Sequence, residues 1–143
     1  MNWYQVKAHL ERVVENGAIK EGSEVFLVKA NSFATAERVA MEEVVQYAAG
    51  GVDVVAIARK NYKEVFASNE ADADKWFKCK LSFLTIAEKS GKEKKTAHLF
   101  LVKAVSALTA HQAVDAFMST SLSCYVIEQV DETKIIDVIE CAG

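Results

Sequence analysis

Hydrophobic and polar residues alternate over two long stretches of the chain, residues 3–14 and 76–87. Aromatic and β-branched residues are common in both stretches, and this combination predicts β-strands. A short polar turn follows each stretch and contains Asn16-Gly17 in the first case and Ser90-Gly91 in the second. Such turns are typical of hairpins, because glycine accepts positive backbone angles. The return strands of the two predicted hairpins are residues 24–30 and 97–104.

After each hairpin the hydrophobic period changes from two residues to about 3.6 residues, which predicts an amphipathic helix on a sheet. The apolar stripes consist of Ala36, Val39, Ala40, Val44 and Tyr47 in the first helix and of Ala110, Ala113, Val114, Phe117 and Met118 in the second. The candidate caps are Ser32 or Thr35 in the first helix and Ser106 or Thr109 in the second. Gly50-Gly51 is expected to end the first helix.

Two further strands are expected after each helix. They cover residues 52–58 and 62–66 in the first half and residues 124–130 and 134–139 in the second. The predicted fold class is therefore α+β, with two pseudo-symmetric β-β-α-β-β repeats that have antiparallel sheets and one helix packed on each. We place the repeats at residues 1–70 and 71–143. Because about 70 residues form only a small core, we expect both repeats to pack into one compact unit.

The two halves also share sequence. FLVKANSFATA at residues 26–36 returns as FLVKAVSALTA at residues 100–110, with eight of eleven positions identical. WYQVK at residues 3–7 returns as WFKCK at residues 76–80. The first match has a shift of 74 residues and the second a shift of 73, so we expect a one-residue length difference in the hairpin loops. An internal duplication accounts for both matches, because each half builds the same local packing.

Four segments resemble a family of short bacterial proteins that is catalogued only as a domain of unknown function: WYQVK, WFKCK, FLVKANSFATAE and WFKCKLSFLTIAEKSGKEKKT. The resemblance extends over essentially the whole chain. It implies a stand-alone bacterial protein, and it brings no activity, cofactor or catalytic residue.

Composition limits the class of protein. Of the 143 residues, 51% are hydrophobic and 26% are charged, as in globular domains. Charged residues interrupt every apolar run before the roughly 18 residues that span a membrane, so we expect no membrane association. The N-terminus lacks the pattern of a secretory signal, and we expect a cytoplasmic protein.

Candidate catalytic chemistry is sparse. The cysteines are Cys79, Cys124 and Cys141, and the histidines are His9, His98 and His111. Neither set has the spacing of metal ligands. The sequence contains no nucleophile elbow, phosphate-binding loop or zinc-protease motif. We interpret the acidic residues 68–75 as a solvated linker rather than a calcium loop. We therefore expect no enzymatic activity, no metal and no cofactor.

Charge is distributed unevenly along the chain. The formal net charge is -3, which argues against a general affinity for nucleic acids. Residues 75–103 nevertheless contain eight lysines and two glutamates, a local charge of +6, so the rest of the chain carries -9. We therefore expect a strongly polarised molecule.

Strand alternation predicts which side chains share one face of a sheet. The helix-facing residues of the first strands are expected to be Tyr4, Val6, Ala8 and Leu10 in one repeat and Phe77, Cys79, Leu81 and Phe83 in the other. The opposite face then carries Trp3, Gln5, Lys7 and His9, or Trp76, Lys78, Lys80 and Ser82. With the basic hairpin and the return strands, the candidate binding residues are Trp3, Lys7, Lys29, Trp76, Lys78, Lys80, Lys92, Lys94, Lys95 and Lys103. We call this set the Trp/Lys face.

Several functions fit the Trp/Lys face. Aromatic rings with interleaved lysines hold single-stranded nucleic acids by base stacking and phosphate neutralisation. The same rings can instead be covered by a second copy or another protein, and a basic loop can protect an edge strand from aggregation. A small anionic ligand such as a nucleotide, held between the repeats, is a further alternative. We expect a non-enzymatic binding or scaffolding protein that acts by self-association or protein–protein contact, with nucleic-acid or nucleotide binding as the alternatives.

Overall fold

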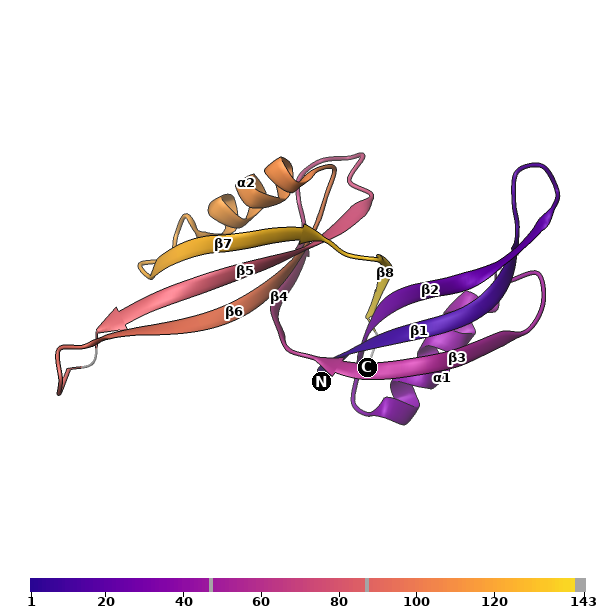
Figure 1. Ribbon diagram of the computed structural model, residues 1–143, viewed down its shortest axis with the longest axis horizontal. Helices are drawn as coiled ribbons and strands as arrows, with labels where there is room; N and C mark the ends of the chain where they lie inside the picture. Colours follow the sequence, from indigo (N-terminus) through magenta and orange to yellow (C-terminus); the bar gives the residue numbers. More distant parts are fainter. Residues whose placement is uncertain (47, 87, 141–143) are drawn as a thin grey trace. The chain divides into compact units, whose positions relative to one another are not determined.

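The computed structural model describes residues 1–46, 48–86 and 88–140 (Figure 1). Within these residues the elements follow the order β-β-α-β-β twice, which confirms the predicted α+β fold. The first repeat contains β1 (Asn2–Val13), β2 (Ile19–Ala30), α1 (Phe33–Val44), β3 (Val52–Lys60) and β4 (Tyr62–Ala67). The second contains β5 (Lys75–Ile86), β6 (Glu93–Ala104), α2 (Ala107–Met118), β7 (Cys124–Glu132) and β8 (Ile135–Glu140).

The hairpins β1–β2 and β5–β6 are longer than the sequence predicts on the return side. Strand β2 begins at Ile19 and strand β6 at Glu93, several residues before the expected starts. These additional residues pair through their backbone but are mostly polar and exposed. Their sequence therefore lacks the alternation of hydrophobic and polar residues from which a strand is predicted. The turns contain Gly17 and Gly91, with φ of 82° and 65°, as hairpin turns require. The second connection is one residue longer than the first, as the shift in the repeat indicates.

The strands form two four-stranded sheets, and each sheet combines both repeats. Sheet A has the order β3-β1-β2-β8, and sheet B has the order β4-β6-β5-β7. The β2–β8 and β4–β6 pairs are parallel, and the other pairs are antiparallel, so each sheet is mixed rather than antiparallel throughout as the sequence predicts. The last strand of each repeat thus completes the sheet of the other repeat. In Figure 1, β8 (yellow) accordingly lies beside β2.

The compact units of the chain therefore differ from the sequence repeats 1–70 and 71–143. Unit 1 contains Met1–Asn61 and the chain from Lys134 onward, and unit 2 contains Tyr62–Thr133. The difference arises because β4 and β8 exchange places, and sequence periodicity does not indicate which sheet edge a strand will join. The further expectation that both repeats pack as one compact unit stays a prediction.

The two exchanged strands, β4 and β8, pair in equivalent registers. In sheet A, Val138 and Ile139 lie opposite Leu27 and Val28, whereas in sheet B the corresponding pairs are Val65 with Leu101 and Phe66 with Val102. Each exchanged strand also has one extra residue at the same place of the repeat, Lys63 in β4 and Ile136 in β8. The two sheets therefore accept the foreign strand in the same way.

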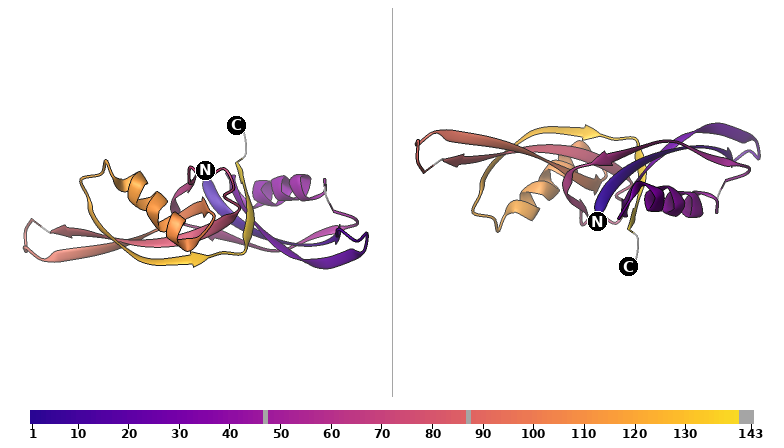
Figure 2. Two further views of the ribbon diagram at one scale, coloured as in Figure 1. Left: turned by 90° about the horizontal axis from the view of Figure 1, so that it is seen from above. Right: turned by 90° about the horizontal axis from the view of Figure 1, so that it is seen from below.

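Each unit has its own core between its sheet and its helix (Figure 2). The core of unit 1 comprises Tyr4, Val6, Ala8, Leu10, Phe26, Val28, Ala30, Ala36, Ala40, Val44 and Val52, with Ile139 of β8 packed against it. The core of unit 2 comprises Phe77, Cys79, Leu81, Phe100, Val102, Ala104, Ala110, Val114 and Met118, with Phe66 of β4 packed against it. These clusters confirm the predicted helix-facing residues of β1 and of Phe77 to Leu81 in β5.

The helix stripes are mostly as predicted, but α1 ends at Val44, before the expected end at Gly50-Gly51. Ala36, Ala40 and Val44 of α1 are buried, whereas the predicted Tyr47 lies outside the described residues. In α2, Phe117 is 44% exposed rather than buried. Its ring stacks on Phe66 of β4, with 4.6 Å between the ring centroids. Phe117 therefore covers the exchanged strand at the margin of the core.

Serine caps both helices, which resolves the choice that the sequence left open. The Ser32 hydroxyl accepts a hydrogen bond from the backbone N–H of Thr35 at 3.1 Å, and the Ser106 hydroxyl accepts one from Thr109 at 3.3 Å. In α2 the backbone N–H of Ser106 also donates to the Thr109 hydroxyl at 3.0 Å, which completes a capping box.

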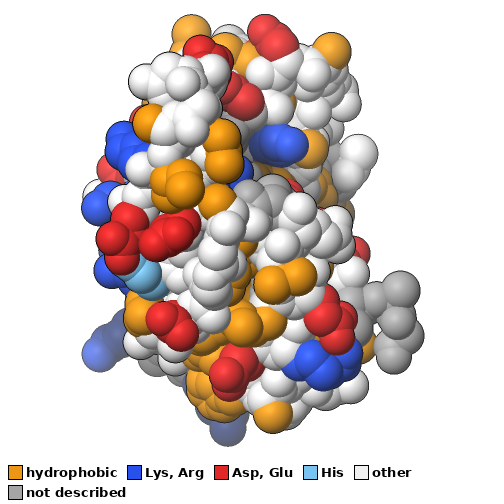
Figure 3. Space-filling model, turned by 90° about the vertical axis from the view of Figure 1, so that its right-hand side faces the viewer, with side chains coloured by type: hydrophobic (Ala, Val, Ile, Leu, Met, Phe, Trp, Pro, Cys, Tyr) orange, Lys and Arg blue, Asp and Glu red, His pale blue; other side chains and the backbone are white. Residues whose placement is uncertain are grey.

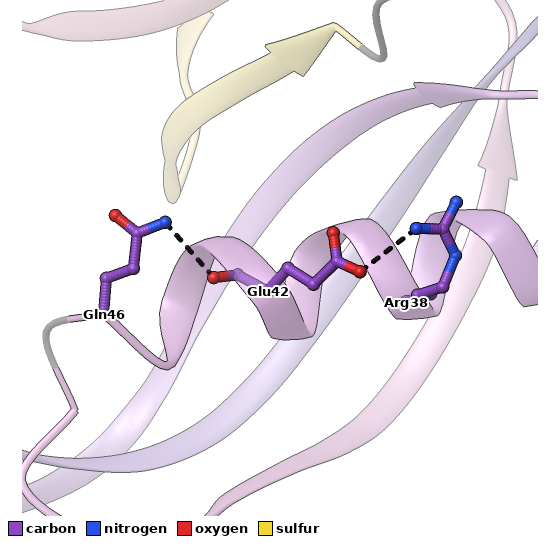
Figure 4. A network of polar contacts seen from close by, with 3 residues as sticks. All are labelled: Arg38, Glu42 and Gln46. Carbon is purple, nitrogen blue, oxygen red and sulfur yellow. Dashed lines mark hydrogen bonds and ion pairs between the residues drawn. The ribbon is translucent and has the colours of Figure 1, made fainter.

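The outer surface of α1 is held by local polar contacts (Figure 4). Arg38 Nη1 lies 3.1 Å from Glu42 Oε1, one helical turn away, and Gln46 Nε2 donates to the Glu42 carbonyl oxygen at 3.4 Å. Exposed pairs of this spacing contribute only about 0.3–0.5 kcal/mol. These contacts therefore add little to the stability of α1. The helix is held on its sheet mainly by the burial of Ala36, Ala40 and Val44.

The exchanged strand β8 offers a direct stability test with a matched control in the next residue. Ile135 is 5% exposed, whereas Ile136 is 46% exposed. We expect Ile135→Ala to lower the free energy of unfolding by about 2–5 kcal/mol, because it leaves a cavity. Ile136→Ala should change it by less than about 1 kcal/mol. Urea unfolding followed by circular dichroism measures both, and equal losses would contradict the placement of β8.

Candidate functional site

Two tryptophan–lysine pairs occupy equivalent places in the two units. Trp3 of β1 lies opposite Lys29 of β2, and the lysine Nζ is 5.5 Å from the centroid of the indole ring. Trp76 of β5 lies opposite Lys103 of β6, with a corresponding distance of 5.9 Å. These separations allow a cation–π attraction, which contributes about 0.5–1 kcal/mol at exposed sites. The structure therefore joins four of the ten residues of the Trp/Lys face into two pairs.

The two tryptophans differ in exposure. Trp3 is half-buried, whereas Trp76 is 7% exposed. The indole Nε1 of Trp76 is also buried and has no hydrogen-bond acceptor among the described residues. Leu27 and Leu101, which lie on the same outer faces of the two sheets, are fully buried. Trp76 is thus a packed side chain, and its ring offers almost no surface on which a base could stack.

Glu128 forms ion pairs with two of the predicted binding lysines. It is the extra residue of a β-bulge in β7, between Gln129, which pairs with Lys80, and Ile127, which pairs with Leu81. Its carboxylate lies 2.6 Å from Lys95 Nζ and 3.9 Å from Lys80 Nζ. Hydrogen bonds from Lys95 and from the buried Ser82, together with the charges of both lysines, lower the pKa of Glu128. The carboxylate is therefore held ionised against the basic face.

Sequence reasoning missed Glu128 because it counted charge along the chain. Strand β7 is distant from β5 in sequence but lies beside it in sheet B. By compact unit, nine lysines and ten acidic residues give unit 2 a net charge of -1, which leaves -2 for unit 1. The positive charge of residues 75–103 is therefore balanced within unit 2, and the two units have similar net charges. On the face drawn in Figure 3, acidic and basic side chains are likewise scattered among hydrophobic ones.

The other predicted lysines do not form one patch. Lys7 is exposed on β1, and Lys78 is half-buried opposite Asp131 of β7. Lys94 lies opposite Thr85 and therefore on the other side of the β5–β6 hairpin from Lys95. Lys92 is exposed in the turn. The basic hairpin thus distributes its lysines over both sides and its tip.

A shallow hollow of about 360 Å³ lies beside Glu128 on the outer face of sheet B. It is lined by Leu84, Glu93, Lys95, Val126 and Glu128, which we call the distal face. Val126 is 50% exposed, and the Lys95–Glu128 ion pair borders it. The distal face therefore combines apolar surface with charges of both signs.

Unit 1 has a different arrangement at the equivalent place. Val55 is the corresponding bulge residue of β3, and it is 55% exposed. A carboxylate is supplied instead by Glu21 of β2, whose Oε1 lies 2.6 Å from His9 Nε2. The two repeats thus share their cores but differ in the polar chemistry of this face.

The linker between the repeats is anchored by Glu70. Asp72 and Asp74 are exposed, as expected for a solvated linker. Glu70 Oε1, however, accepts hydrogen bonds from Ser68 Oγ at 3.1 Å and from the backbone N–H of Val105 at 3.3 Å, just before the cap of α2. Partial desolvation opposes ionisation of Glu70, but hydrogen bonds from Thr109, Val105 and Ser68 lower its pKa.

The remaining groups with possible reactivity are the cysteine thiols and the hydroxyl of Tyr125. Burial and the charge of Asp131 raise the pKa of the Cys79 thiol to about 11, so it is not a nucleophile at neutral pH. The Tyr125 hydroxyl donates to Asp115 Oδ1 at 2.8 Å, and Asp115 Oδ2 lies 3.4 Å from His111 Nδ1. This hydrogen bond, with desolvation and the charge of Asp115, raises the pKa of Tyr125. Cys124 is exposed, and Cys141 lies outside the described residues.

The described part of the chain has neither a cluster of metal ligands nor a helix that could span a membrane. No group of three or more His, Cys, Asp and Glu side chains there is arranged to hold a metal ion. Neither α1 nor α2 is long and apolar enough to cross a membrane.

A family model described as a domain of unknown function, DUF4494, matches residues 2–141. The chain belongs to the DUF4494 family. The match confirms the resemblance to a family of unknown function, and it assigns no activity or site to the DUF4494 chain. No curated protein and no solved structure matches the sequence.

Glu128 predicts a pH dependence of stability. Because its pKa is lower in the folded chain, the stabilisation is complete above the unfolded value of about 4.3 and is lost as pH falls through the folded value. Glu128→Gln should therefore remove part of the decrease in urea midpoint between about pH 6 and about pH 3. Glu132→Gln, an exposed neighbour on β7, serves as the control. An unchanged pH profile in Glu128→Gln would show that the ion pairs contribute nothing.

Proposed function

We propose that this DUF4494 protein is a non-enzymatic binding or scaffolding protein that self-associates through the distal face of sheet B. The observation that carries the proposal is the ion pair between Lys95 and Glu128 beside the half-exposed Val126. From the sequence pattern alone we also propose that it acts in the bacterial cytoplasm.

The charges of the distal face suit contact with a second copy. Lys95 and Glu128 form an ion pair there, Glu93 lines the same hollow, and Lys80 Nζ lies 3.9 Å from the Glu128 carboxylate. In a two-fold contact, residue i of one copy meets residue j of the other, so a face must be complementary to itself. A face that carries both lysine and glutamate around an apolar centre meets this requirement. A surface built for phosphate would instead keep its lysines unpaired.

The apolar side chains of the distal face support the same proposal. Val126 is half-exposed, and Leu84 lines the hollow beside it. Protein interfaces typically have an apolar centre and a polar rim, and a few central side chains contribute most of the binding energy. Val126 is the residue we assign to the centre, with Lys95 and Glu128 in the rim.

Single-stranded nucleic-acid binding is the second candidate. Exposed Lys89, Lys92 and Lys94 near the β5–β6 turn favour it, because they provide positive charge at one end of the hairpin. Burial of Trp76 and the pairing of Lys80 and Lys95 with Glu128 disfavour it, since they remove stacking surface and free charge from the face. The further alternative, a small anionic ligand such as a nucleotide held between the repeats, stays a prediction.

Sedimentation velocity over a range of protein concentrations tests the self-association. We expect a reversible dimer whose dissociation constant rises at least about tenfold in Val126→Asp, because the substitution places an unpaired charge at the centre of the contact. Val55→Asp is the matched control, since it changes a similarly exposed valine on the corresponding strand of sheet A. Equal weakening by both substitutions, or a monomer at every concentration, would refute the proposed face.

A fluorescent single-stranded oligonucleotide, titrated at low and at physiological salt, tests the second candidate on the same samples. We expect no tight binding. Binding that weakens steeply with salt and is lost in the double variant Lys92→Glu/Lys94→Glu would overturn the proposal in favour of nucleic acid.

A further inference from the structure

The chain passes from unit 2 to unit 1 through a single residue. Thr133 is fixed in unit 2, because its backbone N–H and its hydroxyl both donate to the carbonyl oxygen of Trp76 at 2.9 Å. Ile135 is fixed in unit 1, where it lies opposite Val25 of β2. Lys134 alone connects the two, and we call it the C-terminal hinge.

The first repeat has the same construction. Lys60 ends β3 and lies opposite Trp3, whereas Tyr62 begins β4 and lies opposite Leu99 of sheet B. Asn61 alone connects them. A hairpin loop usually needs at least two residues. Neither β4 nor β8 folds back beside the strand that precedes it, and each joins the other sheet.

The position that β8 occupies is defined by unit 1 and by the strand itself. The free edge of β2 offers backbone partners along Val25–Lys29, and the core of unit 1 receives Ile139. Ile135 is buried at the start of the strand. None of these contacts depends on which unit 2 the strand comes from. A β8 strand from any copy of the chain meets the same partners.

We propose that β8 is also exchanged between two copies of the chain, so that each copy completes sheet A of the other in a closed dimer. The contacts of β8 are the same within one chain and between two chains. The balance is therefore set by association entropy against the effective concentration of β8 within its own chain, which is millimolar for short connections. Exchange should become measurable when the chain folds at high concentration. The inference does not depend on the distal face.

Cross-linking of full-length protein distinguishes exchange from any other dimer. Lys29 and Glu140 lie opposite each other in β2 and β8. The variant Lys29→Cys/Glu140→Cys, in a Cys124→Ser/Cys141→Ser background, is unfolded in urea and refolded at about 1 µM or about 500 µM. A short bismaleimide then bridges the two new thiols. On a denaturing gel we expect bridged monomer at the low concentration and at least about fivefold more bridged dimer at the high concentration.

The control pair lies on two strands of sheet A that are not exchanged. Lys7→Cys/Ala56→Cys, in the same background, joins β1 and β3, which both come from the first repeat. Its bridge should stay within one chain at both concentrations. A bridge between chains in this control would indicate non-specific aggregation and would refute the assignment to β8.

The outcomes also separate this inference from the proposed function. If the 29–140 bridge stays within one chain at every concentration, β8 exchange is wrong, even if sedimentation shows a dimer. Such a dimer would then arise from the distal face and would dissociate in Val126→Asp. If the bridge joins two chains and Val126→Asp does not reduce it, exchange is supported independently of the distal face.

Discussion

The parallel pairing of β4 with β6 and of β8 with β2 is the interaction on which the architecture depends. The connections at Asn61 and Lys134 are one residue long, and beyond each of them the strand leaves the sheet of the strand before it. Neither repeat can build a four-stranded sheet from its own strands in this arrangement. Both halves are therefore needed for the observed sheets, because each half supplies the fourth strand of the sheet of the other half.

The repeated segments WYQVK and WFKCK lie next to these two connections. Trp3 lies opposite Lys60, the last residue of β3, and the carbonyl oxygen of Trp76 holds Thr133, the corresponding residue after β7. Lys29 and Lys103 cover the two rings from the ends of β2 and β6. A feature that suggests a ligand site in the sequence thus stabilises the places where the chain passes between units.

The elements could be predicted from the sequence because each depends on neighbours along the chain. Hairpins around Gly17 and Gly91, the serine caps and the helix stripes all follow from local patterns. The exchange of β4 and β8 could not be predicted, because alternation indicates that a strand exists but not which edge it joins. Glu128 was missed for the same reason, since its lysine partners are distant in sequence and adjacent only in sheet B.

Divergence between equivalent positions gives the two outer faces different side-chain chemistry. Glu128 of unit 2 corresponds to Val55 of unit 1, and Lys95 corresponds to Glu21. None of these side chains belongs to either helix-facing core, so folding imposes little constraint on them. In unit 2 the result is a carboxylate on edge strand β7 that pairs with Lys80 of β5 and Lys95 of β6. In unit 1 the edge residue is apolar, and the polar contact between His9 and Glu21 lies on β1 and β2. A partner that needs a charged edge beside an apolar centre can therefore distinguish sheet B from sheet A.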